Sequence, residues 1–313
     1  MGAELLIVMN IRNSLLHPSR LLAGMWARLG QNVSDATYLK LRYRLIFGER
    51  LNLAFPKGYN EKINWLKIYN RNPIYPRMVD KAEVKEVVRP IIGDDKIIKT
   101  LGVWERFDDI DFESLPDQFV LKSTNGGGGT GVVICKDKSK FNRVDAKKKI
   151  ERSMHFNWRF EREWVYRDLK PRIIAEEYMF NEDGTDLVDW KIHCFNGEPK
   201  VLFYASDRYT PGEKLKFDWY DINLNHLPVK SKGYDNANKT ITPFPEWEQM
   251  KDVARKLSEG LPYVRVDLYL INHKIYFGEL TFFHDGGAVA LEPNEWEDKF
   301  GSWIELPEKV IER

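Results

Sequence analysis

The sequence is poor in cysteine and has no excess of charge of either sign. Its 313 residues include two cysteines, Cys135 and Cys194, which excludes a disulfide framework and a cysteine-rich zinc site. Both lie in apolar stretches typical of strands, so we expect two small buried side chains in a reducing compartment. Lys and Arg together number 48 and Asp and Glu 47, and the resulting net charge of +1 argues against a dedicated nucleic-acid-binding protein.

Long apolar runs are also missing. No stretch approaches the roughly 18 consecutive apolar residues that span a membrane, and the run at residues 5–9 follows Glu4 and has no clear cleavage site, unlike a signal peptide. These features favour a cytoplasmic location for the protein. The leucines between residues 15 and 29, with Arg20 and Arg28, predict an amphipathic helix. We expect it to pack on the rest of the chain, and peripheral contact with the inner face of the membrane is the alternative.

The hydrophobic pattern changes from helical to strand-like along the chain. Residues 35–75 are mainly helical, and a further helix begins at Asp80, which has capping-box spacing with Glu83, and ends at Pro90 and Gly93. Since most of the later strands are joined as hairpins with helices between them, we expect an α+β fold. Strands are expected at residues 119–122, 132–135, 173–179, 190–195, 201–204, 264–270 and 275–282, and helical sections at 141–168 and 247–257.

The C-terminal hairpin carries the sharpest functional signal. With a three-residue turn at residues 272–274, Ile271 pairs with Ile275, Asp267 with Glu279 and Arg265 with Thr281. The opposite face is then apolar or aromatic, which favours this register because that face can be buried. It carries Val264, Val266, Leu268, Leu270, Tyr276, Leu280 and Phe282.

Two carboxylates directly opposite each other destabilise a sheet unless a positive charge neutralises them. Asp267 and Glu279 therefore predict a divalent cation, Mg²⁺ or alternatively Mn²⁺, with a nucleotide phosphate completing its shell. The alternative is a solvated face on which Arg265 offsets the two negative charges.

A glycine-rich loop is the second signal. Four consecutive glycines let backbone N–H groups approach phosphate oxygens, and a preceding lysine supplies a cation. The loop is neither a Walker A motif nor a dinucleotide fingerprint, because no Gly-Lys-Ser/Thr follows it and a strand comes next. A flexible solvent loop is the alternative. The residues concerned are Lys122, Asn125, Gly126, Gly127, Gly128 and Gly129.

Three further groups of polar residues are weaker candidates. The strand at residues 173–179 ends in Glu176 and Glu177 and suits either a purine-binding edge or an ordinary edge strand. Lys191 shares a face with Asp189 and His193, and either contacts a phosphate or pairs with Asp189; we expect His193 to be structural. His284 and Asp285 follow the acidic hairpin directly and are candidates for substrate contact.

In their order, these elements resemble the ATP-grasp superfamily: a lysine opens a helix, a second precedes a glycine-rich hairpin loop, an acidic strand follows, and a hairpin with paired acids closes the chain. The similarity is closer to its teichuronopeptide-biosynthesis (TupA-like) branch, proteins of bacterial surface-polysaccharide clusters that are often described as glycosyltransferases. It extends over about residues 35–305 and rests on residues 47–53, 59–67, 79–81, 189–197, 264–269 and 276–282.

The resemblance implies an ATP-grasp fold, in which two α+β subdomains hold ATP between them, with a helical N-terminal extension. We expect a helical region over residues 1–76 and a first subdomain with the glycine-rich loop over residues 77–180. The C-terminal subdomain with the acidic hairpin would cover residues 181–313.

The resemblance also implies roles for individual residues. Lys81 and Lys122 would bind ATP phosphates beneath the glycine loop. Lys191 and Arg265 would lie at the γ-phosphate and the acyl-phosphate, with Arg208 as a weaker candidate there. The other implied contacts are Glu176 with the adenine amine, the backbone of Glu177, Tyr178 and Met179 with the adenine ring, Asp183 or Asp186 with the ribose, and Asp267 and Glu279 with Mg²⁺.

One position departs from the pattern of many ATP-grasp ligases, which carry asparagine two residues after the last metal-binding glutamate. Here that residue is Thr281. A hydroxyl replaces an amide oxygen, so the metal would be held through water or with help from Asp285. The TupA-like pattern itself has threonine at this place.

The activity implied by the resemblance is that of an ATP-dependent carboxylate–amine ligase. A uronic acid of a surface polysaccharide or its precursor would form an acyl-phosphate, and an amino acid or small amine would displace phosphate to give an amide. One alternative is a glycosyltransferase, whose metal motif would have to be Asp109 and Asp111. The others are a sugar kinase that uses the same ATP site and a non-catalytic nucleotide-binding protein.

Overall fold

The computed structural model describes residues 26, 30–127, 130–155, 157–206 and 215–310. Apart from Trp26, the amphipathic pattern at residues 15–29 lies outside the described residues, as do Gly128, Gly129 and Arg208. Within the described ranges, no helix combines the length and the apolar character of a membrane span. Cys135 and Cys194 are buried and free, as predicted.

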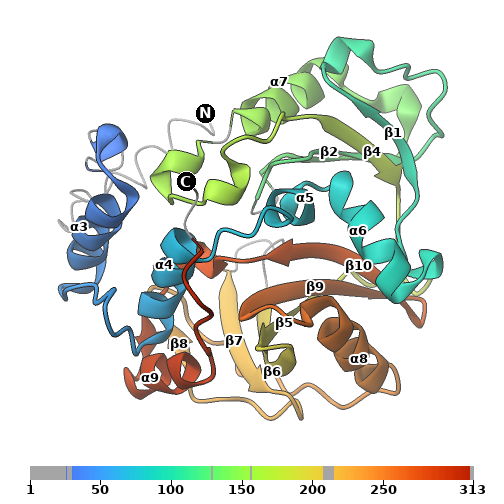
Figure 1. Cartoon of the computed structure of the whole chain (residues 1–313). Helices are drawn as coiled ribbons and strands as arrows, with labels where there is room; N and C mark the ends of the chain where they lie inside the picture. Colours follow the sequence, from blue (N-terminus) through green and yellow to red (C-terminus); the bar gives the residue numbers. More distant parts are fainter. Residues whose placement is uncertain (1–25, 27–29, 128–129, 156, 207–214, 311–313) are drawn as a thin grey trace.

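The smaller of the two main sheets lies in the upper part of Figure 1. Its strands are all antiparallel to their neighbours, and the helix α7 (Arg143–Met154) covers one face and packs on β2 and β3. Asn142 begins this helix, because its side chain accepts hydrogen bonds from the backbone N–H groups of Val144 and Asp145. In spatial order the strands are β1 (Thr100–Trp104), β4 (Ile173–Glu177), β2 (Phe119–Ser123) and β3 (Val132–Cys135).

The larger sheet lies below it and is also antiparallel throughout. The helix α8 (Trp247–Ser258) packs on β5, β6 and β9 and buries an apolar stripe at helical spacing, which includes Met250, Ala254 and Leu257. In spatial order the strands are β10 (Lys274–Thr281), β9 (Tyr263–Ile271), β5 (Asp189–Phe195), β6 (Glu198–Ser206) and β7 (Lys216–Asp221).

The remaining helices pack mainly against the core of the larger sheet. Val84, Val88 and Ile92 of α6 (Glu83–Ile92) belong to this core, and α4 (Tyr59–Tyr69) packs on α9 (Glu295–Ser302). The other elements are α3 (Asp35–Phe47), α5 (Tyr75–Val79), β8 (Lys230–Ser231) and β11 (Leu291–Glu292). Short 3₁₀ helices span Gly30–Asn32 (η1), Asp94–Lys96 (η2), Phe107–Asp109 (η3), Lys138–Lys140 (η4), Trp158–Phe160 (η5), Trp164–Tyr166 (η6) and His284–Gly287 (η7).

These elements confirm the α+β class and the helical character of the described part of residues 35–75. The charged section at residues 141–168 is helical only over α7, and 3₁₀ turns follow it. Asp80 accepts from the backbone N–H groups of Ala82 and Glu83, but Glu83 pairs with arginines instead of closing the capping box. The helix α6 continues through Pro90 and ends before Gly93, which has a φ of 92°.

The turn between β9 and β10 differs from the prediction. It contains two residues, Asn272 and His273, with φ values of 50° and 62°, and Ile271 pairs with Lys274 instead of Ile275. Tyr276 consequently pairs with Tyr269, on the face opposite to the one predicted. The backbone conformation of this short turn matches the twist of the two strands, which explains why two residues suffice.

A β-bulge then restores the predicted pairing at the acidic end of the hairpin. The ladder passes from Phe277 opposite Leu268 to Glu279 opposite Asp267, so Gly278 is an extra residue. A Cβ atom on Gly278 would lie 2.9 Å from the Asp267 carbonyl oxygen, so the close approach of the two strands requires glycine. The predicted pairs Asp267–Glu279 and Arg265–Thr281 are therefore confirmed.

Candidate functional site

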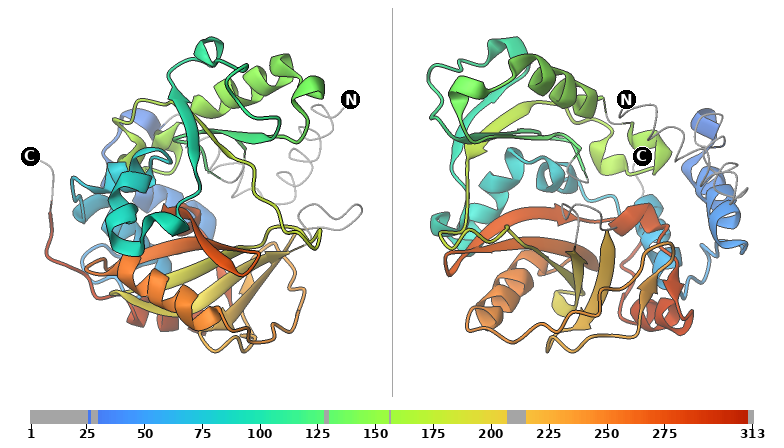
Figure 2. Two further views of the ribbon diagram at one scale, coloured as in Figure 1. Left: turned by 90° about the vertical axis from the view of Figure 1, so that its right-hand side faces the viewer. Right: turned by 180° about the vertical axis from the view of Figure 1, so that it is seen from behind.

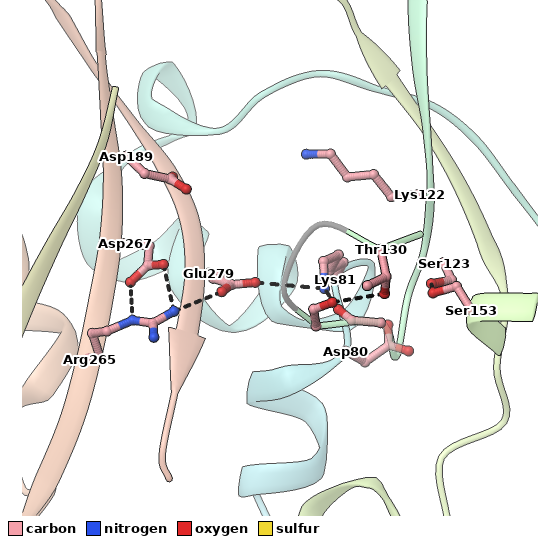
Figure 3. A network of polar contacts seen from close by, with 12 residues as sticks. Asp80, Lys81, Lys122, Ser123, Thr130, Ser153, Asp189, Arg265, Asp267 and Glu279 are labelled. Atoms are coloured by element: carbon pink, nitrogen blue, oxygen red, sulfur yellow. Dashed lines mark hydrogen bonds and ion pairs between the residues drawn. The ribbon is translucent and has the colours of Figure 1, made fainter. Parts of the chain in front are cut away.

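The two main sheets face each other across a cavity of about 1260 Å³. Figure 3 shows the charged side chains that meet there: Lys122 comes from the small sheet, and Asp189, Asp267, Glu279 and Arg265 come from the large one. Lys191, Thr281, His284 and Asp285 also line this cavity. Residues predicted from separate parts of the sequence thus come together in one place.

Arg265 is the centre of the charge network on the large sheet. It donates two hydrogen bonds to Asp267, from Nε to Oδ1 at 2.6 Å and from Nη2 to Oδ2 at 2.8 Å, and one to Glu279 Oε1 at 3.0 Å. Lys191 lies opposite Asp267 on β5 and donates to both Asp267 and Asp189. Arg265 therefore offsets part of the charge of the two opposed carboxylates, as the alternative without a metal predicts. This pairing does not exclude a metal site at the same two acids.

The chemistry of this donor set suits a divalent cation that is shared with phosphates. Glu279 Oε2 lies 3.7 Å from Lys81 Nζ, which is a long ion pair. Because a carboxylate oxygen has more than one lone pair, this oxygen can also bind a cation. Among the described residues, no three His, Cys, Asp or Glu side chains form a cluster that could hold a metal alone. Asp267, Glu279 and the hydroxyl of Thr281 would therefore supply part of a shell, with phosphate or water oxygens as the rest.

The predicted phosphate-binding lysines approach the cavity from the other side. Lys81 donates to the carbonyl oxygen of Gly126 and lies near Glu279, so it joins the glycine loop to the acidic hairpin (Figure 3). Lys122 Nζ lies 2.6 Å from Glu176 Oε2. Lys85, which the sequence analysis did not single out, also pairs with Glu176. Its position four residues after Lys81, in the helix predicted to begin at Asp80, is the feature of the sequence that could have indicated it.

The described part of the glycine loop is closely packed at its two ends. Ideal Cβ atoms would lie 2.3 Å from Ser123 Oγ at Gly126 and 2.1 Å from Ser153 Oγ at Gly131. These two serine hydroxyls hydrogen-bond each other at 2.6 Å, and Asn125 donates to the Met154 carbonyl oxygen on α7. Asn125 thus anchors the loop to α7, whereas Gly126 and Gly127 line the cavity.

We expect Gly131→Ala to lower the free energy of unfolding by about 1–3 kcal/mol, because the added methyl group overpacks the contact with Ser153. Gly127→Ala is the matched control: among the described residues, no atom other than those of its chain neighbours lies within 4 Å of its ideal Cβ position, and we expect a change within about 0.5 kcal/mol. Urea unfolding of both variants measures the difference. Equal stability of the two would contradict this packing.

A second cavity, of about 540 Å³, adjoins the first and shares Lys122, Asp189 and Lys191 with it. The predicted adenine-binding stretch lines it, namely Glu176, Glu177, Tyr178 and Met179, together with apolar side chains of both sheets that include Val132, Ile134 and Ile271. Of the two ribose candidates, Asp186 lines this cavity. Asp183 instead accepts hydrogen bonds from the backbone N–H and the hydroxyl of Thr185.

The other end of the large cavity is formed by residues around His284. Its Nδ1 accepts from Arg265 Nη1 at 3.1 Å, and burial lowers the pKa of His284 to about 4, which suits a neutral acceptor. Glu161, Glu163 and Tyr166 line the same end and were not predicted. No motif marks them, because they lie in an irregular segment after α7. His193 is fully buried in the core and hydrogen-bonds to Tyr263, as expected of a structural residue.

The chain bends sharply at this end, since Asp285, Gly286 and Gly287 have positive φ values of 45°, 60° and 60°. A polar stripe on α4 holds the bend: Asn64 donates to Gly287 O at 2.8 Å, and buried Lys67 donates to Gly286 O and to Glu161 O. The stripe lies within the segment 59–67 that the sequence analysis singled out, and it places Asp285 at the cavity.

The chain is similar to a known protein family and to solved structures. A family model described as TupA-like ATPgrasp matches residues 61–305. D-alanine–D-alanine ligase from Helicobacter pylori has 14% sequence identity and a TM-score of 0.43, over 79% of this chain and 69% of that one. D-alanine–D-alanine ligase from Bacillus anthracis complexed with ATP has 15% identity and a TM-score of 0.38, over 66% of this chain and 54% of that one.

D-cycloserine synthetase has 13% identity and a TM-score of 0.40, over 67% of this chain and 64% of that one. The chain thus spans less than two thirds of the length of the Bacillus anthracis ligase and of the synthetase. The comparison with curated protein sequences found no match.

Proposed function

Because the chain belongs to the TupA-like ATP-grasp family, and ATP-grasp enzymes are ATP-dependent carboxylate–amine ligases, we propose that this protein joins a carboxylate to an amine at the cavity between its two sheets. The observation that carries this proposal is the meeting of two lysines, Lys81 and Lys122, with Glu279 across one cavity, where the buried Asp267 lies directly opposite Glu279 in the hairpin. A triphosphate with a divalent cation is the ligand that this combination of charges suits best.

The adjoining smaller cavity is the proposed site of the adenosine part of ATP. Its apolar walls would hold the purine ring, the backbone at Glu177, Tyr178 and Met179 would contact the ring edge, and Asp186 would contact the ribose. Lys122 lines both cavities and would therefore lie beside the phosphates. Gly126 and Gly127 would cover them from the small-sheet side.

In the proposed reaction, the substrate carboxylate attacks the γ-phosphate in line, which gives an acyl-phosphate and ADP. The amine then displaces phosphate and forms the amide. Lys191 and Arg265 offset negative charge on the transferring group, because phosphoryl transfer depends on positioning and charge more than on covalent help. When bound, Mg²⁺ would neutralise phosphate charge, with Asp267, Glu279 and Thr281 as its protein ligands. His284 and Asp285 would contact the substrate.

The substrates that we propose are those that resemblance to the family implies. A uronic acid of a bacterial surface polysaccharide, or its lipid- or nucleotide-linked precursor, would supply the carboxylate, and an amino acid or small amine would supply the nitrogen. We propose that the reaction takes place in the cytoplasm, where ATP is available. The subdomain boundaries after residues 76 and 180 and the choice of Mg²⁺ over Mn²⁺ stay predictions.

A glycosyltransferase is less well supported than a ligase. Its metal motif would need Asp109 and Asp111, but Asp109 pairs with Arg106, and Asp111 accepts from the backbone N–H of Glu113. Neither aspartate lines either of the two cavities. The kinase alternative uses the same cavity, but a sugar hydroxyl replaces the carboxylate as the acceptor of the γ-phosphoryl group and no amine takes part, so only the product distinguishes it.

Mass spectrometry of the products tests the proposal. The protein is incubated with ATP, Mg²⁺, a set of uronic acids and a set of amino acids and small amines, with hydroxylamine in parallel to trap an acyl-phosphate as a hydroxamate. We expect ADP, phosphate and an adduct whose mass is the sum of the two substrates less one water. A phosphorylated sugar without any amide would overturn the ligase in favour of a kinase.

A further inference from the structure

One end of the large cavity carries three acidic side chains from two segments that are far apart in the chain. Glu161 and Glu163 lie between the 3₁₀ turns η5 and η6, and Asp285 lies in the bend that follows β10. Lys67 joins the two segments, because it donates to the carbonyl oxygens of Glu161 and Gly286. We refer to the part of the cavity that Glu161, Glu163 and Asp285 line as its acidic end.

The three carboxylates of the acidic end differ in their partners. Glu161 forms an ion pair with Arg42 of α3. Among the described residues, the carboxylate of Glu163 has neither a hydrogen bond nor an ion pair. Asp285 Oδ2 lies 3.8 Å from His284 Nε2, and this imidazole is neutral because burial lowers its pKa to about 4. Glu163 and Asp285 therefore face the cavity with negative charge that no contact neutralises.

The surroundings of Glu163 suit a bound organic cation. Burial raises the pKa of its carboxyl to about 7, against the opposing charge of Lys67. Lys67 is not a direct partner, since its ammonium group donates to two backbone carbonyl oxygens. In the described part of the chain, no three His, Cys, Asp or Glu side chains cluster closely enough to hold a metal ion. An ammonium group needs fewer carboxylates than a metal, and two are present.

A series of contacts leads from the acidic hairpin to the acidic end. Glu279 Oε1 accepts from Arg265 Nη2 at 3.0 Å, and Arg265 Nη1 donates to His284 Nδ1 at 3.1 Å. The other nitrogen of the same imidazole lies 3.8 Å from Asp285. His284 therefore lies between the hairpin, where the phosphates are proposed to bind, and the acidic end.

His284 has an unused hydrogen-bond donor at this position. Because its Nδ1 accepts a hydrogen bond, the neutral ring carries its hydrogen on Nε2. His284 is 1% exposed and lines the cavity, and its Nε2 has no hydrogen-bond partner among the described residues. A buried N–H group without an acceptor lowers stability, so this atom indicates a ligand oxygen. The carbonyl oxygen of an acyl group suits it, since that oxygen gains negative charge when a nucleophile attacks the carbon.

We propose that the acidic end is the subsite of the amine substrate: Glu163 and Asp285 bind its ammonium group, and His284 Nε2 donates to the carbonyl oxygen of the neighbouring acyl-phosphate. This inference rests on the proposed function. Glu163 accepts one proton from the ammonium group, and the lone pair of the nitrogen attacks the carbonyl carbon. The C–N bond forms, the bond from this carbon to the phosphate oxygen breaks, and phosphate leaves with a second proton from the nitrogen.

The same charges decide where each of the two substrates binds. The negative acidic end repels the carboxylate of a uronic acid and attracts a cation. The acyl group therefore binds on the Arg265 side of His284, and the amine binds on the Asp285 side. The ligand class of the acidic end is thus an organic ammonium ion, either a simple amine or an amino acid.

The test compares charged with uncharged nucleophiles, using the full-length protein with ATP, Mg²⁺ and glucuronate or galacturonate. Hydroxylamine is mostly uncharged at neutral pH, whereas ethanolamine and glycine are ammonium ions. Glu163→Gln should lower kcat/KM for these two amines about ten-fold or more, because a charge-assisted hydrogen bond is lost. Hydroxamate formation should change less than about two-fold, whereas a merely structural role of Glu163 would lower both rates alike. Mass spectrometry measures the amides and the hydroxamate.

Asp285→Asn is a second variant that tests the same subsite. The φ of Asp285 is 45°, which asparagine adopts readily, and its side chain is about half exposed, so we expect this variant to fold. It should also lower kcat/KM for the amines without lowering hydroxamate formation. Reaction of ethanolamine, of glycine or of both supports the subsite and shows whether the amine substrate can carry a carboxylate.

Asp137→Asn is the matched control. Asp137 lines the same cavity after β3, but its carboxylate already pairs with Lys140 and accepts from Ser139. It should change kcat/KM for any of the three nucleophiles by less than about two-fold. A wild type that forms neither ADP nor hydroxamate would contradict the proposed function. Hydroxamate formation by the wild type without any amide, or unchanged amine kinetics in Glu163→Gln and Asp285→Asn, would overturn this inference alone.

Discussion

Asp267→Asn should abolish the Mg²⁺ dependence of nucleotide binding and lower ATP turnover by a factor on the order of 10²–10³, the usual loss when one preorganised charge is removed from a phosphoryl-transfer site. Asp267 is 1% exposed and is held by Arg265 and Lys191, so the substitution removes a negative charge from a defined position. Titration calorimetry of ATP with Mg²⁺ and with EDTA measures the effect on binding, and ADP release measures turnover.

The matched control for this substitution is Asp189→Asn. Asp189 also pairs with Lys191 and lines the cavity, but it lies opposite Tyr269 at the start of β5 and is not part of the Asp267–Glu279 pair. ATP binding by this control should still respond to Mg²⁺. If Asp267→Asn bound ATP more tightly with Mg²⁺ than with EDTA, to the same degree as the wild type, the paired acids would not be the metal site.

Arg265→Met should have the largest effect on stability, a loss of about 3–5 kcal/mol in the free energy of unfolding. The guanidinium group is buried, and its removal leaves Asp267 and Glu279 opposite each other with less compensating charge. Because a divalent cation at the two acids would replace part of that charge, Mg²⁺ should stabilise the variant more than the wild type. Urea unfolding with and without Mg²⁺ gives both quantities.

Arg255→Met controls for loss of an arginine that pairs with two acids. Arg255 lies on α8 and pairs with Glu198 and Asp252, but all three side chains are about half exposed or more, and such surface pairs contribute at most about 1 kcal/mol. A loss of stability in Arg265→Met no greater than that in Arg255→Met would show that Arg265 is not the main counter-charge of the hairpin.

The acidic hairpin shows both the reach and the limit of reasoning from sequence. Alternation of polar and apolar residues correctly placed Asp267 opposite Glu279 and Arg265 opposite Thr281, because burial of the apolar face selects that register. The turn is one residue shorter than predicted, and the bulge at Gly278 compensates for it. Alternation does not reveal an extra residue when a second irregularity cancels it, so Tyr276 was placed on the wrong face.

Contacts between distant segments were beyond the sequence analysis. Residue types and spacing predicted a phosphate contact for Lys122, and family resemblance implied an adenine contact for Glu176, but which ion pairs they form depends on how β2, β4 and α6 pack together. The same holds for Glu161 and Glu163, which reach the cavity from an irregular segment with no repeating pattern. Residues 59–67 stood out as a segment that resembles the family, yet the Gly286 and Gly287 carbonyls that Lys67 and Asn64 bind lie more than 200 residues away in the chain.

The separation of the two apolar cores has a consequence for how ligands enter. Among the described residues, the core beneath α7 and the core of the larger sheet have no member in common. The smaller sheet with α7 and the larger sheet with its helices are the two halves of the molecule, and they can therefore tilt relative to each other without disrupting either core. Polar contacts such as the ion pair of Lys81 with Glu279 would break during this movement. Figure 2 shows the two halves from two further directions. A bound polyanion would attract both halves, so we expect variants that bind nucleotide more tightly to have a smaller angle between the halves.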